Sequence, residues 1–534
     1  MTTDQPLRFT SSATDQRFRH PWKRLVTVGR AYELLRHDLL EHMKILQDRI
    51  GFEYTRFHAI FHDEMQVYSE DEQGNPVYQW KHVDRILDDT RAIGLRHVIE
   101  LNSMPKLLAS GTQTIFNFKM NVTPPKSYEK WEALVKAFVE HLVERYGLAE
   151  IRQWYFECWN EPDLGGFWSG TQEEYFQLYA ASARAVKAVH PDLQVGGPAS
   201  SRGQWVADFI HFCKRENVPM DFVATHQYPQ DEYCLFENRV GSPHQPDMFF
   251  IDSIRDVRAT VDQEAGAGFP LLYTEWNTQN AAPGRAVTWG RNPDLDTIYS
   301  GSSVLHYLTH LDDAVDMFGW WTASDLFEFQ GEPVGMPTAA FSSGYGLLSV
   351  RGAPKPAFHA LRFLSQLTGR RMDLDLGDAP RPSLAGATAV EFSDRVRIVL
   401  WNHQSNAVPS EGNWKARVHI QLPAALAAAV RVQRIDFHVR PGNGAAYEVW
   451  LNMGRPQNLT RTEEEALRLA AEPAVSFGYS DVTDGGTIVE IDLTPCEFAL
   501  IELSLPGTPS KERAEEQTAG ALNDLLSYKP APAS

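Results

Sequence analysis

Two glutamates that lie far apart in the sequence each end an apolar stretch. Glu161 closes the aromatic run Trp154–Glu161, which Pro162 stops, and Glu275 closes the run Leu271–Glu275. Such runs predict buried strands. A carboxyl group held against tryptophans is expected to have a raised pKa, which suits a general acid. A lone glutamate there would more simply cap the next helix. Two such strand ends instead supply the pair of carboxyls that glycoside hydrolysis uses.

The stretches around these glutamates alternate between strand-like and helix-like patterns, which predicts a parallel sheet with helical crossovers. The predicted strands are Leu25–Val28, Tyr54–Ile60, His97–Leu101, Gln153–Trp159, Gln194–Gly197, Phe222–His226, Leu271–Glu275 and Asp316–Trp321. The predicted helices are Leu39–Ile50, Val83–Ile93, Tyr128–Tyr146, Glu173–Val189, Trp205–Glu216, Phe249–Ala265, Ile298–Leu311 and Ala357–Leu367. This order predicts a (β/α)8 TIM barrel over residues 21–370, with both glutamates at the mouth formed by the strands' carboxyl ends.

The pattern changes to short strands after about residue 370. The β-rich stretches are Val390–Phe392, Val396–Trp401, Ala416–Leu422, Val430–Val439 and Val489–Leu505, and helices are scarce apart from Arg461–Ala471. They predict an appended β-sandwich over residues 371–505. Within the N-terminal segment 1–20, Leu7–Thr10 is a candidate strand of that sandwich. Segment 506–534 is rich in Pro, Ala, Ser and charge, which is typical of a mobile tail.

The composition argues against several classes of partner. The formal net charge of −19 disfavours nucleic acid and anionic membrane surfaces. Aromatic residues make up 11% of the chain, which suits stacking on sugars as well as large cores. The four cysteines, Cys158, Cys213, Cys234 and Cys496, are scattered, and no His-x-His or His-Glu-x-x-His spacing occurs, so we predict no disulfide framework, metal or cofactor. The polar N-terminus and the lack of a long apolar run predict a cytoplasmic protein.

Several motifs together resemble a known family. Trp159-Asn160-Glu161-Pro162 with Thr274-Glu275-Trp276-Asn277 resembles the superfamily of (β/α)8 glycosidases whose catalytic glutamates follow strands four and seven. Further stretches narrow the resemblance to glycoside hydrolase family 39, the family of β-xylosidases and α-L-iduronidase. These stretches are Arg56–His58, Met104–Gly111, Asn121–Pro125, Gly196–Pro198, Trp321–Asp325, Gly344–Leu347 and Met453–Pro456. The resemblance covers barrel and sandwich and is closer to the xylosidase branch.

The resemblance implies a retaining double displacement. Glu275 would attack the anomeric carbon as the nucleophile, and Glu161 would protonate the leaving oxygen and then act as base on water. Asn160 would bond the sugar 2-hydroxyl.

Further substrate-binding positions follow from the same resemblance. The alternative is an ordinary exposed glutamate for Glu328 and a structural role for the others. His58 matches a sugar-binding histidine, and His226 and Tyr228 match a pair near the nucleophile. Trp321 would form the floor of the sugar site. The remaining candidates are Glu328, as an acceptor for a sugar hydroxyl, and Phe116 and Phe167, as walls of the pocket.

Three departures from the family pattern leave the substrate open. Asp163 stands where an Asn usually follows, Trp276 replaces the commoner Tyr, and the loop Gln279–Ala282 lacks an expected aromatic residue. We predict an exo-acting β-D-xylosidase that releases xylose from the non-reducing end of xylo-oligosaccharides. The alternatives are an α-L-arabinosidase, an α-L-iduronidase that uses Arg285 or Arg291 as the partner of a uronate carboxylate, and a non-catalytic carbohydrate-binding protein. The oligomeric state stays open, and a homo-oligomer is one alternative.

Overall fold

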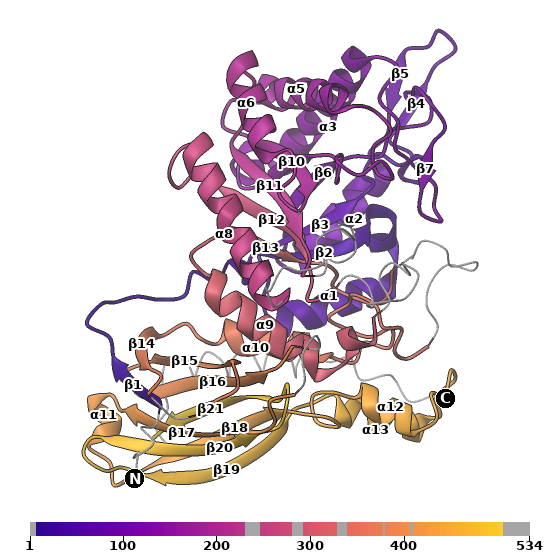
Figure 1. Ribbon diagram of the computed structural model, residues 1–534. Helices are drawn as coiled ribbons and strands as arrows, with labels where there is room; N and C mark the ends of the chain where they lie inside the picture. The colour runs from indigo at the N-terminus through magenta and orange to yellow at the C-terminus, as the bar shows by residue number, and fades with distance from the viewer. Residues whose placement is uncertain are drawn as a thin grey trace.

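The computed structural model describes residues 7–229, 246–279, 292–327, 339–377, 380–405 and 410–505. A closed barrel forms the upper part of the molecule, and a nine-stranded sheet forms the lower part (Figure 1). The predicted tail, Glu328, Arg285, Arg291 and Cys234 lie outside the described residues. No helix in the described part of the chain is long and apolar enough to cross a membrane.

The barrel contains eight parallel strands, in the order β10-β11-β12-β13-β2-β3-β6-β9. These strands are β2 (Leu25–Arg30), β3 (Tyr54–His58), β6 (Arg96–Leu101), β9 (Tyr155–Cys158), β10 (Gln194–Ser201), β11 (Phe222–Gln227), β12 (Leu271–Trp276) and β13 (Met317–Trp320). Each overlaps a predicted strand, and the predicted TIM barrel with an appended sandwich is confirmed.

Helices surround the barrel, and some of them begin at side-chain caps that the sequence provides. The Ser127 hydroxyl accepts from the Lys130 N–H at 3.2 Å, and Thr171 forms a capping box with Glu174. The α-helices of this part are α1 (His37–Arg49), α2 (Lys81–Ala92), α3 (Tyr128–Tyr146), α4 (Leu148–Ile151), α5 (Gln172–Val189), α6 (Val206–Glu216), α8 (Pro246–Glu264), α9 (Ile298–Leu311) and α10 (Pro356–Ser365). Short 3-10 helices occur at Pro21–Lys23, Ala31–Leu35, Asp63–Met65 and Pro293–Asp296. Two small hairpins pair β4 (Tyr68–Glu70) with β5 (Pro76–Tyr78) and β7 (Thr114–Ile115) with β8 (Met120–Asn121).

The barrel interior consists of an apolar layer with a charged layer above it. Alternate residues of a barrel strand point inward, so one strand serves both layers. In β3, Tyr54 belongs to the apolar interior cluster, whereas Arg56 pairs with buried carboxylates. The apolar cluster comprises Leu25, Tyr54, Val98, Ala199, Phe222, Ala224, Leu272 and Met317. The charged layer lies two residues further along several of these strands and therefore closer to the mouth.

The nine-stranded sheet has the order β19-β18-β21-β16-β15-β14-β1-β17-β20. Its strands are β1 (Leu7–Ser11), β14 (Arg370–Asp375), β15 (Leu384–Glu391), β16 (Arg395–His403), β17 (Trp414–Gln421), β18 (Arg431–Val439), β19 (Ala474–Asp481), β20 (Gly486–Leu493) and β21 (Phe498–Ser504). The expected N-terminal strand is present, because β1 pairs antiparallel with β14 and parallel with β17. Side chains from β16, β17, β20 and β21 share one core, so the sheet folds over on itself.

The β-rich stretch Val489–Leu505 contains parts of two strands, because a turn separates β20 from β21. The N–H of Glu497 donates to the Thr494 carbonyl at 3.0 Å, and Cys496 has a φ of 63°. Strands β14 and β19 and helices α11 (Ala424–Ala427) and α12 (Tyr447–Asn452) were not predicted. Helix α13 (Arg461–Ala470) lies within the predicted helix Arg461–Ala471.

Helices α9 and α10 lie between the barrel and the sheet (Figure 1). A Cβ at Gly301 in α9 would come within 2.5 Å of the Phe498 ring of β21 and 2.8 Å of the Pro356 carbonyl oxygen. A glycine therefore permits the close packing of the two parts at this point.

Candidate active site

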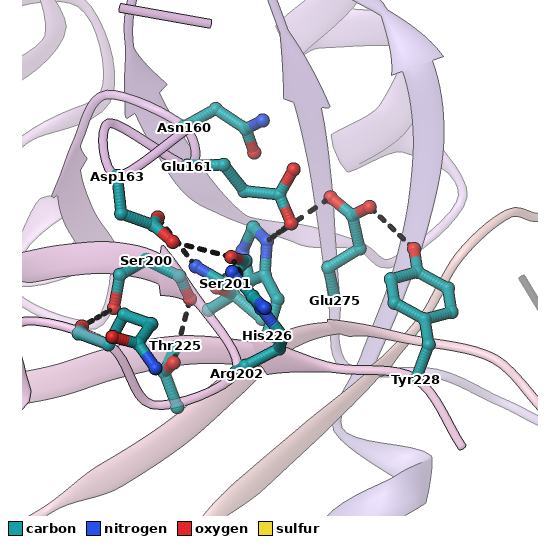
Figure 2. Close-up of polar contacts among 12 residues, drawn as sticks. Asn160, Glu161, Asp163, Ser200, Ser201, Arg202, Thr225, His226, Tyr228 and Glu275 are labelled. Carbon is teal, nitrogen blue, oxygen red and sulfur yellow. Dashed lines mark hydrogen bonds and ion pairs between the residues drawn. The ribbon is translucent and has the colours of Figure 1, made fainter. Parts of the chain in front are cut away.

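The side chains of Glu161 and Glu275 point toward one another, as Figure 2 shows. Glu161 lies just beyond β9 and is 8% exposed, while Glu275 lies in β12 and is 6% exposed. One carboxyl oxygen of each residue and one ring nitrogen of His226 lie within 4.8 Å of one another. Retaining glycosidases hold their two carboxyls ~5–5.5 Å apart and inverting enzymes ~6.5–9.5 Å apart. The observed proximity fits the retaining geometry.

Backbone turns after β9 direct Glu161 into the site. Trp159 and Glu161 both have positive φ, 67° and 43°, and the Glu161 N–H donates to the Ala199 carbonyl at 2.8 Å. The Glu161 Oε1 lies 3.2 Å from Nδ1 of His226. Burial, followed by the negative charge of Asp163, raises the pKa of Glu161 to about 8. Glu161 is thus suited to carry a proton at neutral pH.

Glu275 is surrounded by hydrogen-bond donors. The Tyr228 hydroxyl donates to its Oε1 at 2.6 Å, and Nη1 of Arg56 donates to its Oε2 at 3.3 Å. Burial raises the pKa of Glu275, while the positive charge of Arg56 acts in the opposite direction. The donors favour the ionised form that a nucleophile requires. Neighbouring residues of a strand normally point to opposite faces, yet both Thr274 and Glu275 face the interior. They can do so because the pairing of β12 with both adjacent strands is irregular near this end.

Arg56 links the carboxylates beneath the mouth. Its Nε donates to Glu157 Oε2 at 2.6 Å, and its Nη2 lies 2.7 Å from Glu100 Oε2. The same Nη2 donates to Oδ1 of Asn160 at 2.9 Å. Because its oxygen is engaged in this way, Asn160 retains its amide N–H groups for a ligand.

Aromatic rings gather beside this polar layer. Nδ1 of His58 lies 2.8 Å from Oε2 of Glu100. The centre of the His58 ring lies 4.6 Å from that of Trp321 and 6.2 Å from that of Phe116. Burial, followed by the charge of Arg56, lowers the pKa of His58 to about 3, so the ring is neutral. Phe116 meets Phe167 edge-on at 5.5 Å. Such rings can stack on the apolar faces of a sugar.

The structure brings together nearly all the predicted site residues that it describes. His226, Tyr228 and Asn160 contact the two glutamates or their partners, and Trp321 belongs to an apolar cluster with Tyr228, Leu295, Phe327 and Tyr345. Phe116 and Phe167 are half-buried and reach the site through His58. Glu328 lies outside the described residues.

Three buried charged residues were not predicted as site residues, namely Arg56, Glu100 and Glu157. All three have 0% exposure. A usable indication was present in the sequence, because each charge interrupts an apolar strand pattern, and a buried charge needs a partner.

A group of side chains that could hold a metal ion also occurs here among the described residues, and it consists of Glu161, His226 and Glu275. Arg56 and the Tyr228 hydroxyl already provide positive charge and hydrogen bonds to Glu275. This donor set matches an acid and a nucleophile better than a cation site. The lack of a metal stays a prediction.

Comparisons with known proteins identify the family. The model for "Glycosyl hydrolases family 39" matches residues 7–487. A β-xylosidase of Geobacillus stearothermophilus is 37% identical over 529 residues, which cover 96% of this chain and 97% of that protein. The α-L-iduronidase of Canis lupus familiaris is 31% identical over 515 residues, which cover 88% of this chain and 73% of that protein. The crystal structure of a monomeric β-xylosidase from Caulobacter crescentus CB15 is 30% identical with a TM-score of 0.80, covering 94% of this chain and 99% of that one.

Proposed function

The chain belongs to family 39 of the glycosyl hydrolases, and we propose that it is a retaining β-D-xylosidase that removes xylose from the non-reducing end of β-1,4-xylo-oligosaccharides. The β-xylosidase relative matches nearly the full length of both chains. The observation that supports the chemistry is the placement of Glu161 and Glu275, with carboxyl oxygens within 4.8 Å in two different environments.

The two environments support different roles for the two glutamates. Glu161, whose pKa is raised to about 8, holds the proton that the leaving oxygen requires. Glu275, with donors from Tyr228 and Arg56, attacks the anomeric carbon. The bond between that carbon and the leaving oxygen breaks as Glu275 bonds to the sugar and Glu161 gives up its proton. Water then attacks the same carbon while Glu161 takes its proton, and the bond between that carbon and Glu275 breaks. Xylose is released, and Glu275 is again ionised.

Neighbouring residues would bind the sugar. Asn160 presents its amide to the 2-hydroxyl, because Arg56 fixes its oxygen. Trp321 and His58 line the sugar site, and Phe116 and Phe167 form the wall on the side of the leaving group. Glu328 stays a predicted acceptor for a sugar hydroxyl.

Trapping of the covalent intermediate tests the mechanism. A 2,4-dinitrophenyl 2-deoxy-2-fluoro-β-xyloside should inactivate the enzyme, and peptide mass spectrometry should find the fluorosugar on Glu275. NMR of the first product formed from an aryl β-xyloside should show the β-anomer. A label on another residue, or an α-anomer as first product, would reject the assignment.

A panel of aryl glycosides tests the substrate. We expect kcat/KM for the β-D-xyloside to exceed that for the α-L-arabinoside, α-L-iduronide and β-D-glucoside by about tenfold or more, which corresponds to ~1.4 kcal/mol of transition-state binding. A preference for the iduronide would instead favour the uronidase alternative. No turnover of any glycoside would favour a non-catalytic binding protein.

A further inference from the structure

The imidazole of His226 lies between the two catalytic carboxyls on one side and a strand hydroxyl on the other. Its Nδ1 is 3.2 Å from Glu161 Oε1 and 3.7 Å from Glu275 Oε2 (Figure 2). Its Nε2 is 3.2 Å from Oγ1 of Thr274. A neutral imidazole carries one N–H, so one of its nitrogens donates and the other accepts. The tautomer therefore determines whether Glu161 faces a donor or an acceptor.

Thr274 constrains this choice through its own hydrogen bond. Its Oγ1 lies 2.5 Å from Oε1 of Glu157, the ion-pair partner of Arg56, and a carboxylate only accepts hydrogen bonds. The single hydroxyl hydrogen of Thr274 must therefore point to Glu157. Its lone pairs then face Nε2 of His226, and this contact is favourable only if Nε2 carries the hydrogen.

Arg56 is the other group near Nε2, with Nη2 at 3.5 Å. That distance exceeds the usual ~2.7–3.2 Å of a hydrogen bond from N–H. Nη2 has two hydrogens and lies closer to Asn160 Oδ1, at 2.9 Å, and to Glu100 Oε2, at 2.7 Å. The distances thus assign the position beside Nε2 to Thr274.

With its hydrogen on Nε2, His226 presents a lone pair at Nδ1 to Glu161. The hydrogen between Nδ1 and Oε1 must then belong to Glu161. We infer that Thr274, oriented by Glu157, is a positioning residue that fixes the Nε2–H tautomer of His226 and thereby keeps the catalytic proton on Glu161. This inference rests on the proposed role of Glu161 as the acid.

The proton balance leaves His226 unchanged throughout. The Glu161 proton passes to the leaving oxygen in the first step, and the attacking water replaces it in the second. In each state Nδ1 remains an acceptor, which favours the return of the proton to Glu161. The donors to Glu275 are then Tyr228 and Arg56 rather than His226.

The electrostatic surroundings are compatible with this arrangement. Burial lowers the pKa of His226 to about 4, so the ring is neutral at pH 7. The charged and titratable groups around Glu161 come from β3, β6, β11, β12 and the loops after β9, β10 and β11. They are Arg56, Glu100, His226, Tyr228, Glu275, Asp163 and Arg202. A substitution at Thr274 changes the charge of none of them, so a shift in the titration of Glu161 would report the tautomer.

NMR of the resting enzyme labelled with ¹⁵N-histidine tests the inference directly. In wild type and in Thr274→Ser, His226 should carry its hydrogen on Nε2 at pH 7. In Thr274→Val, which keeps the shape but removes the hydroxyl, the hydrogen should move to Nδ1 and point to Glu161. The spectrum of His226→Gln assigns the signal. A wild-type His226 that is protonated on Nδ1 or on both nitrogens, or a tautomer unchanged in Thr274→Val, would overturn the inference.

Kinetics give a second readout that a purely structural role would not produce. In Thr274→Val, the alkaline limb of kcat/KM should fall by about one pH unit, because the hydrogen bond from His226 now favours the ionised form of Glu161. Turnover of xylobiose should fall further than that of 2,4-dinitrophenyl β-xyloside, whose leaving group needs no proton. An equal loss on both substrates without a shifted limb would contradict the inference. The NMR result does not depend on the substrate, so it distinguishes failure of this inference from failure of the proposed function. The wild-type spectrum tests the tautomer even if Thr274→Val does not fold.

Discussion

Asp163 offers the most direct test of how the surroundings of Glu161 set its chemistry. Its carboxylate accepts hydrogen bonds from the backbone N–H of Ser201, at 2.8 Å, and from the Ser201 hydroxyl (Figure 2). After burial, its charge is the largest cause of the raised pKa of Glu161. The substitution Asp163→Asn removes this charge and keeps an oxygen for the Ser201 N–H. Asn is also the residue that the family pattern leads one to expect here.

The expected sign follows from the role of Glu161 as an acid. Removing a negative neighbour stabilises the ionised carboxylate, so the pKa of Glu161 falls and the alkaline limb moves to lower pH. A neighbouring like charge changes a carboxyl pKa by about one unit, so the limb should move from about 8 to about 7. The protonated fraction would then change little at pH 6 but fall by about tenfold at pH 9.

The assay is kcat/KM for an aryl β-xyloside from pH 5 to pH 10, because this ratio reports ionisations of the free enzyme. Asp208→Asn is the control, since it removes the same charge from the exposed surface of α6 and should leave the limb in place. An unmoved limb in Asp163→Asn would refute the electrostatic reasoning. A uniform loss at pH 6 and pH 9 would indicate structural damage instead.

The barrel was predictable because its elements have strong and regular patterns. Helices α3 and α9 match their predicted ranges to the residue, since their apolar residues recur with helical spacing and polar residues or a glycine bound them. The buried strands read as apolar runs, as parallel strands covered on both faces do.

The second sheet was harder to predict because several of its strands lack a clear difference between buried apolar and exposed polar positions. The edge strand β19 exposes the apolar side chains of Val475, Phe477 and Tyr479. Its alternation of apolar and polar residues therefore does not identify a buried face. The turn between β20 and β21 contains no glycine, and Cys496 takes the left-handed conformation instead. Pro495 was the available indication that the apolar run was interrupted.

For the site, the sequence identified the two glutamates but not the charges beneath them. Arg56, Glu100 and Glu157 could be recognised as unusual inside apolar strands. Their pairing, however, depends on which strands are neighbours around the closed barrel and on their stagger. The same limit applies to Thr274, whose contacts come from β9 and β11.

Three further predictions follow from single contacts. Glu275→Ala should lower kcat by several orders of magnitude on every aryl xyloside, and azide should restore turnover as the α-xylosyl azide, detectable by NMR; a loss under about tenfold would reject the nucleophile. Gly301→Leu should destabilise the fold by ~1–3 kcal/mol, because its side chain would overlap the Phe498 ring. Thermal unfolding should show the loss, while kcat/KM at 25 °C stays near wild type; an unchanged melting temperature would contradict the packing argument. Tyr228→Phe removes the 2.6 Å hydrogen bond to Glu275. Because a hydrogen bond to a charged group contributes ~1.5–3 kcal/mol, kcat/KM should fall by about 10–100-fold. The same hydroxyl favours the ionised form of Glu275, so its loss should raise the pKa of that carboxyl and move the acidic limb to higher pH. An acidic limb that stays in place would mean that Tyr228 contacts the sugar without stabilising the nucleophile.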